Sequence, residues 1–175
     1  FLIITYKNIQ PNNIIKMGTR GIFGFRYKGK YYVVYNHYDS YPSGLGKQII
    51  NELKEALFDG SFAEWKIKLD FIIEVNDVTI PTDDDIKALE PYTDLSVSNQ
   101  NTNDWYCLLR NCQGSIKRVL DSGYILNHVD KNGNPINENY AYIIDLDTNR
   151  FIDYTSGEIF YEKGMGCEFN NLPDY

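Results

Sequence analysis

The sequence predicts an α+β fold, with a single antiparallel sheet built from two hairpins and helices packed on one face of that sheet. Two observations carry this prediction. Stretches rich in aromatic and β-branched residues lie at 21–36 and at 140–154. Between them, apolar residues recur at helical spacing. The chain has 175 residues, 43% of them hydrophobic, and this is enough for one core, so we expect a single domain over 17–175.

The first hairpin is the most specific structural prediction. Lys28-Gly29 is a two-residue turn between strands at 21–27 and 30–36, with glycine where a positive φ is needed. A two-residue turn fixes the register of both strands. The register places Arg20 opposite His37, just beyond the ends of the strands.

The middle of the chain predicts helices. Residues 45–57 have an amphipathic helical pattern, and 61–75 favour a helix although their alternation also fits a strand. Thr82 is followed by three aspartates, which is typical of a capped helix start and explains them without a metal. Residues 105–120 predict one broken helix or two short ones, divided near Gly114.

The second hairpin is predicted at 140–154, around a turn at Thr148-Asn149, and a strand at 158–161 could extend it. The segment 1–16 differs from the rest, because it has no sustained period and precedes Met17, which opens the strand-forming region. We therefore expect residues 1–16 to be an N-terminal extension outside the domain.

A chain that begins at Met17 is expected to unfold at the same temperature as the full chain, because an extension contributes no core contacts. Thermal unfolding of the two chains side by side checks this. A large drop in melting temperature of the shorter chain would show that residues 1–16 belong to the domain.

The charge composition bears on whether the protein binds nucleic acid. A net charge of −7 argues against non-specific binding of nucleic acid. Residues 1–38, however, carry six Lys and Arg and no acidic residue. We expect this basic hairpin to pack beside acidic neighbours of the same domain, with a local anion site as the alternative.

Location and partners are predicted from what the sequence lacks. No apolar run approaches the ~20 residues of a membrane-spanning helix, so we expect no membrane partner. The three cysteines form no C-x-x-C pair and the start of the chain does not resemble a signal peptide. These features favour a soluble, intracellular protein without a cofactor.

The densest polar stretch follows the first hairpin. Arg20, His37 and Asp39 are the candidate catalytic residues, since a histidine beside a carboxylate can act as general base and an arginine can hold an anionic group. A polar cluster that merely fixes the hairpin end is the alternative. The candidate ligand-binding residues nearby are Arg26, Asn36, Ser43, Gly44 and Gly46.

Two further interpretations of this region remain open. The two histidines each precede an aspartate by two positions, as His37-x-Asp39 and His128-x-Asp130, and could share a metal ion. Turn chemistry explains Asp130 already, so no metal site is predicted. The tyrosines of segment 27–41 could form a stacking surface for bases or sugars, although such residues are commonly half-buried in a sheet.

Four motifs resemble a family of uncharacterised proteins met in giant DNA viruses, fungi and some bacteria. They are Met17-Gly-Thr-Arg-Gly21, Tyr35-Asn-His-Tyr-Asp-Ser-Tyr-Pro-Ser-Gly-Leu-Gly46, Trp105-Tyr-Cys-Leu-Leu-Arg110 and Tyr142-Ile-Ile-Asp-Leu-Asp147. The resemblance implies no activity. We expect a binding or structural module of a giant DNA virus or similar source, and the alternative is a small hydrolase or transferase that uses the Arg20, His37 and Asp39 cluster.

Overall fold

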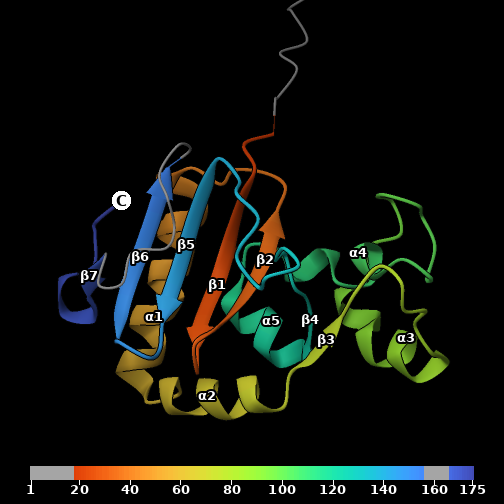
Figure 1. The fold of residues 1–175 in the computed structure, drawn as a ribbon, viewed down its shortest axis with the longest axis horizontal. Coiled ribbons are helices and arrows are strands. Elements are labelled where there is room, and N and C mark those ends of the chain that lie inside the picture. Colours follow the sequence, from red (N-terminus) through yellow and green to blue (C-terminus); the bar gives the residue numbers. More distant parts are fainter. Residues whose placement is uncertain (1–17, 156–165) are drawn as a thin grey trace, which may run out of the picture.

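A mixed β-sheet forms the centre of the protein, with helices on one face and a small helical lobe beyond one edge (Figure 1). The structure is a computed structural model and describes residues 18–155 and 166–175. The proposed extension at 1–16 and the possible strand at 158–161 lie outside the described residues. The prediction of an α+β fold is confirmed.

The sheet has five strands in the order β2-β1-β5-β6-β7. Both predicted hairpins are present, and the first has the predicted register from Gly21–Asn36 to Tyr27–Lys30. The strands are β1 (Gly21–Tyr27), β2 (Lys30–Asn36), β5 (Tyr140–Asp145), β6 (Arg150–Thr155) and β7 (Cys167–Glu168).

The prediction of a single antiparallel sheet is wrong, because β1 and β5 join the two hairpins in parallel. Parallel neighbours require a long crossover between them, and the helices of the middle of the chain supply it. Both strands bury nearly every residue, on both faces of the sheet. Such continuous burial is characteristic of strands with parallel neighbours.

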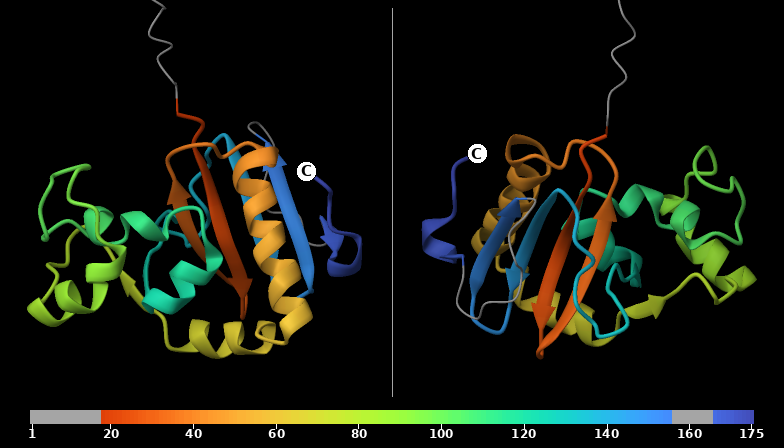
Figure 2. Two further views of the ribbon diagram at one scale, coloured as in Figure 1. Left: turned by 180° about the vertical axis from the view of Figure 1, so that it is seen from behind. Right: turned by 45° about the horizontal axis from the view of Figure 1, so that its top comes forward.

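Three helices pack on one face of the sheet, as Figure 2 shows from behind. Their side chains build the main core with the inward residues of β1 and β5, for example Phe25, whose ring meets that of Trp65 edge-on at 5.6 Å between centroids. These helices are α1 (Lys47–Asp59), α2 (Phe62–Asp70) and α5 (Ile116–Ser122). The predicted helix at 61–75 is correct to Asp70, after which the chain forms a strand.

The elements of segment 73–126, apart from α5, form the lobe beyond β2. Its aspartate-rich helix begins with a reciprocal capping box between Thr82 and Asp85, as predicted. Two short strands pair in parallel beside it. These elements are β3 (Ile73–Val75), α3 (Asp83–Leu89), the 3₁₀ turn η2 (Glu90–Tyr92), α4 (Trp105–Leu108), the 3₁₀ turn η3 (Arg110–Cys112) and β4 (Tyr124–Leu126).

The outer edge of β2 is covered by the chain that leaves β4. The backbone N–H of His128 donates to the carbonyl oxygen of Val33 at 2.9 Å. The side-chain amide of Asn127 accepts from the N–H of Val33 and donates to the carbonyl of Tyr31, each at 2.9 Å. This amide therefore bonds to the edge of β2 as the peptide group of a neighbouring strand would.

The basic hairpin is paired with acidic residues of the same domain, as expected. Arg26 Nη1 lies 3.3 Å from a carboxylate oxygen of Asp145 on β5. Lys28 pairs with Asp70, and Lys30 pairs with Glu74. These contacts occupy Arg26, a candidate ligand-binding residue, within the fold, and a ligand role for it stays a prediction.

Candidate functional site

The loop after β2 is held by buried polar side chains. Asn36 is 6% exposed, and its Nδ2 donates to Ser40 Oγ at 2.8 Å and to the carbonyl of Tyr38 at 2.5 Å. The N–H of Ser40 in turn donates to the carbonyl of Thr19 at 3.1 Å. Asn36 therefore fixes the path of this loop, and the structure does not test whether it also binds a ligand.

A glycine-rich turn, η1 (Pro42–Gly46), leads from this loop into α1. A Cβ at Gly44 would lie 2.2 Å from the carbonyl oxygen of Asp39, and one at Gly46 would lie 2.7 Å from the ring of Tyr142. Both glycines are thus required for close packing of the turn against the loop and the sheet. A ligand role for Ser43, Gly44 and Gly46 stays a prediction.

Arg20 and Asp39 form no ion pair among those that join the described residues. For Asp39 to join Arg20 and His37 in the candidate catalytic cluster, strand alternation would have to continue past β2. Asp39 instead has a φ of 52°, in the left-handed region, and its backbone carbonyl accepts from Leu45 N–H at 2.9 Å. The alternation ends there, and the Asp39 residue is exposed.

The charge of Arg20 acts on His37, which it would face if the register of the hairpin continued by one pair. Burial lowers the pKa of His37, and the positive charges of Arg110 and Arg20 lower it further. The His37 ring nitrogen Nδ1 lies 2.8 Å from the hydroxyl oxygen of Tyr35. His37 is therefore a neutral imidazole near pH 7, in a positively charged environment that the hairpin alone does not provide.

Arg110 is the functional candidate that the sequence did not single out. It reaches the end of β2 from η3, where its Nη1 donates to Gln113 Oε1 at 3.1 Å. The same oxygen accepts from the backbone N–H of His37 at 3.1 Å, so Gln113 connects the lobe to the loop. The centre of the Arg110 guanidinium lies 5.7 Å from the centroid of the Tyr38 ring.

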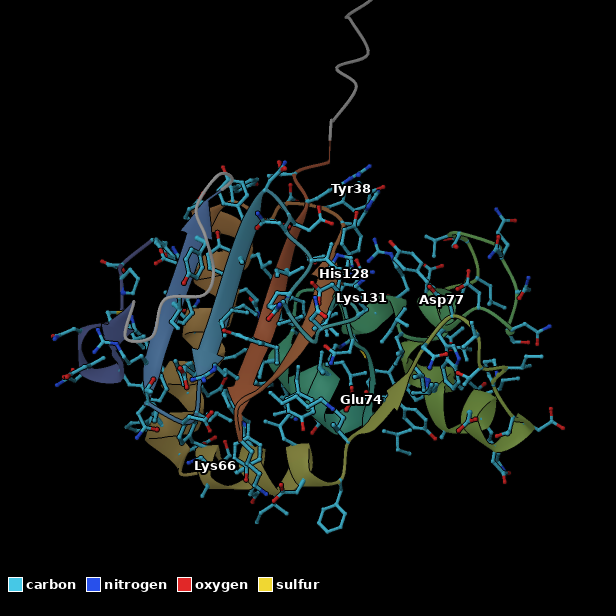
Figure 3. All side chains as sticks on the ribbon, viewed as in Figure 1. Tyr38, Lys66, Glu74, Asp77, His128 and Lys131 are labelled. Atoms are coloured by element: carbon cyan, nitrogen blue, oxygen red, sulfur yellow. The ribbon has the colours of Figure 1, made fainter. Side chains whose placement is uncertain are left out.

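A cleft of about 380 Å³ lies where the loop meets the lobe. Tyr38, with 53% of its surface exposed, stands at the end of β2 (Figure 3). Arg110 forms no ion pair in the described part of the chain, and its buried Nε has no hydrogen-bond partner. The lining residues are His37, Tyr38, Val97, Ser98, Tyr106 and Arg110.

His128 lies on the other side of Tyr35, whose ring centroid is 5.8 Å from that of His37 and 5.4 Å from that of His128. Its Nε2 lies 3.2 Å from a carboxylate oxygen of Glu138. Over residues 18–155 and 166–175, no group of three or more His, Cys, Asp and Glu side chains is placed to hold a metal ion. The geometry thus gives no support to a metal shared by both histidines.

Comparison with known proteins adds no identification at this point. No family model, curated protein or solved structure matches this chain. The resemblance to the viral family therefore stays a prediction, and the functional argument rests on the cleft itself. Among the described helices, none has the length and apolar character needed to span a bilayer.

The lowered pKa of His37 predicts a pH dependence of stability. The unfolded chain binds the proton more strongly than the folded one, so stability is lost as the pH falls from about 6.5 towards the lower folded pKa. Above 6.5 the residue is neutral in both states and has no effect. Comparing melting temperatures of the wild type and His37→Gln near pH 7.5 and 5.5 checks this, and equal losses in both proteins would contradict it.

Proposed function

We propose that the protein is a binding module that holds a small anionic ligand in the cleft between the end of β2 and the lobe. The observation that carries this proposal is that Arg110 lines the cleft beside His37 and has no ion-pair partner among the described residues, while the charge of Arg20 also acts on His37. The protein has a net charge of −7, and its hairpin cations are paired with carboxylates. Arg110 lines the cleft without an ion-pair partner among the described residues, and a second positive charge acts on the same histidine, so the cleft is suited to bind an anion.

The ligand contacts follow from this geometry. Arg110 supplies a planar guanidinium with N–H donors to spare, and Arg20 adds positive charge from the exposed side of the loop. The imidazole of His37 has one nitrogen bonded to Tyr35 and its other nitrogen available. An anion in the cleft would stabilise protonated His37, so binding is expected to raise its pKa.

Binding of inorganic phosphate at low ionic strength is expected, with loss of at least tenfold in affinity for Arg110→Gln, because a charge-assisted hydrogen bond is removed. Isothermal titration measures the affinity, and NMR titration of the His37 ring measures its pKa. Phosphate should raise that pKa in the wild type. Arg110→Gln should raise it without phosphate, because a neighbouring positive charge is lost.

Arg118→Gln is the matched control, since Arg118 is an exposed arginine of the same region whose Nη1 donates to the carbonyl of Asn111. It should leave phosphate affinity unchanged. Equal affinity in the wild type and Arg110→Gln, or no binding at millimolar phosphate, would reject the anion cleft.

A small hydrolase or transferase is the second candidate function, favoured by the neutral state of His37. In the tautomer whose Nδ1–H donates to the Tyr35 hydroxyl oxygen, Nε2 carries the lone pair and can accept a proton. Asp39 forms no described bond to this histidine, so the carboxylate of the predicted catalytic cluster is not part of the arrangement. Release of phosphate from p-nitrophenyl phosphate, abolished in His37→Gln, would favour the enzyme over the binding module.

We also propose an intracellular location. The three cysteines, Cys107, Cys112 and Cys167, are free thiols, and burial raises the pKa of each. Thiols of this kind are typical of a reducing compartment. Fractionation of cells that express the full-length protein tests this, and recovery from the medium would reject it.

A further inference from the structure

We propose that the ligand of this cleft is a free nucleotide, or a close analogue with an aromatic ring and a phosphate, and this inference rests on the proposed anion site. The volume of about 380 Å³ is in the range of sites for whole small molecules. A phosphate ion alone would fill only a small part of it. The ligand therefore needs a second group besides its anion.

The walls of the cleft indicate the chemistry of that second group. Two tyrosines line it, Tyr38 from the loop after β2 and Tyr106 from α4, and neither is buried. Aromatic side chains at a cleft are suited to stack on the flat ring of a base. Val97 adds an apolar contact from the lobe.

Arg110 lies close both to the aromatic wall of the cleft and to the place proposed for the anion. Its guanidinium lies over the ring of Tyr38, at 5.7 Å from the centroid, while it also lines the cleft beside His37. One arginine can thus contact the phosphate while Tyr38 contacts the ring. A ligand with an aromatic ring and a phosphate close together therefore fits the spacing of Tyr38 and Arg110 better than an aromatic ring or a phosphate alone.

The charge of the whole protein favours a free nucleotide over a nucleic-acid strand. A strand brings many phosphates, and a net charge of −7 over the chain disfavours binding of a long polyanion. A free nucleotide carries its negative charge on one phosphate group, which can lie next to Arg110 in the cleft. A free nucleotide and a nucleic-acid strand both present a base and a phosphate, so the experiment must distinguish them.

Titration calorimetry with the full chain should compare four probes: 5′-AMP, adenosine, inorganic phosphate and a 5′-phosphorylated deoxyadenosine oligonucleotide. 5′-AMP is expected to bind at least about tenfold more tightly than phosphate, the contribution of one stacked base. Adenosine should bind more weakly than 5′-AMP. Tighter binding of the oligonucleotide than of 5′-AMP would overturn the free nucleotide in favour of a strand.

Tyr38→Leu tests the ring contact. It should abolish the preference for 5′-AMP over phosphate while phosphate affinity stays within about twofold of the wild type. Phe58→Leu is the matched control, because Phe58 is an exposed aromatic residue of α1 outside the cleft, with 95% of its surface exposed. It should retain the full preference.

The outcomes separate this inference from the proposed function. Equal affinities for 5′-AMP and phosphate, both reduced by Arg110→Gln, would overturn the nucleotide and keep the anion cleft. Binding of neither probe at millimolar concentration would overturn both. An unchanged preference in Tyr38→Leu would overturn the role given to the tyrosine.

Discussion

Replacement of Gly24 by alanine is expected to destabilise the protein by at least about 3 kcal/mol, through overpacking and backbone strain together. Gly24 has a φ of 152°, and a Cβ there would lie 2.0 Å from the backbone carbonyl oxygen of Tyr32. The residue is in β1, which pairs with β2 on one side and β5 on the other. Neither strand can move away without breaking hydrogen bonds, so the strain cannot relax locally.

Gly29→Ala is the matched control for this substitution. Gly29 also has a positive φ, of 72°, but no atom lies within 4 Å of a Cβ placed there. Its replacement should cost only about 1 kcal/mol, the conformational penalty of a left-handed alanine. Urea unfolding measures both free energies, and equal losses would refute the steric explanation for Gly24.

Asp145→Ala is expected to cost roughly 2–4 kcal/mol, because it removes a buried acceptor and leaves its partners unsatisfied. Asp145 is 4% exposed and accepts from the N–H groups of Asp147 and Thr148 at 2.9 and 3.1 Å. It also pairs with Arg26 at 3.3 Å. The substitution therefore loosens the turn between β5 and β6 and leaves the Arg26 guanidinium with only its longer contact to Asp147, at 3.8 Å.

A double-mutant cycle with Arg26→Gln separates the ion pair from the turn contacts. Asp145→Ala should remain destabilising in the Arg26→Gln background, since the two N–H bonds are still lost. Lys28→Gln is the control for an exposed pair, with Asp70, and should change stability little. Urea unfolding of the set would contradict this account if Asp145→Ala and Lys28→Gln had equal effects.

Local sequence signals predicted the elements of this fold better than their assembly. The Lys28-Gly29 turn fixes a hairpin because both strands are adjacent in the chain, and Thr82 caps a helix through residues within one turn. The parallel pairing of β1 with β5 joins segments more than a hundred residues apart. Both strands are buried on both faces in the structure, but their apolar pattern in the sequence is similar to that of a hairpin strand, so the sequence did not indicate the parallel pairing.

In the candidate site, too, the sequence predicted local features better than contacts between distant segments. The register of the first hairpin, from Gly21–Asn36 to Tyr27–Lys30, is the one that the sequence predicted, and the charge of Arg20 acts on His37 just beyond it. Asp39 follows the strand by only three residues, yet its left-handed backbone ends the alternation on which its role depended. Arg110 and Tyr106 reach the cleft from the lobe, and no local spacing connects them to His37.

The amide of Asn127 has a consequence for the behaviour of the protein at high concentration. An uncovered edge strand is a template on which a second chain can add by backbone pairing, leading to aggregation. Asn127 occupies both the N–H of Val33 and the carbonyl of Tyr31. Together with the backbone N–H of His128, this side chain blocks intermolecular strand addition along this part of β2, at a position where a sixth strand of the sheet would otherwise dock.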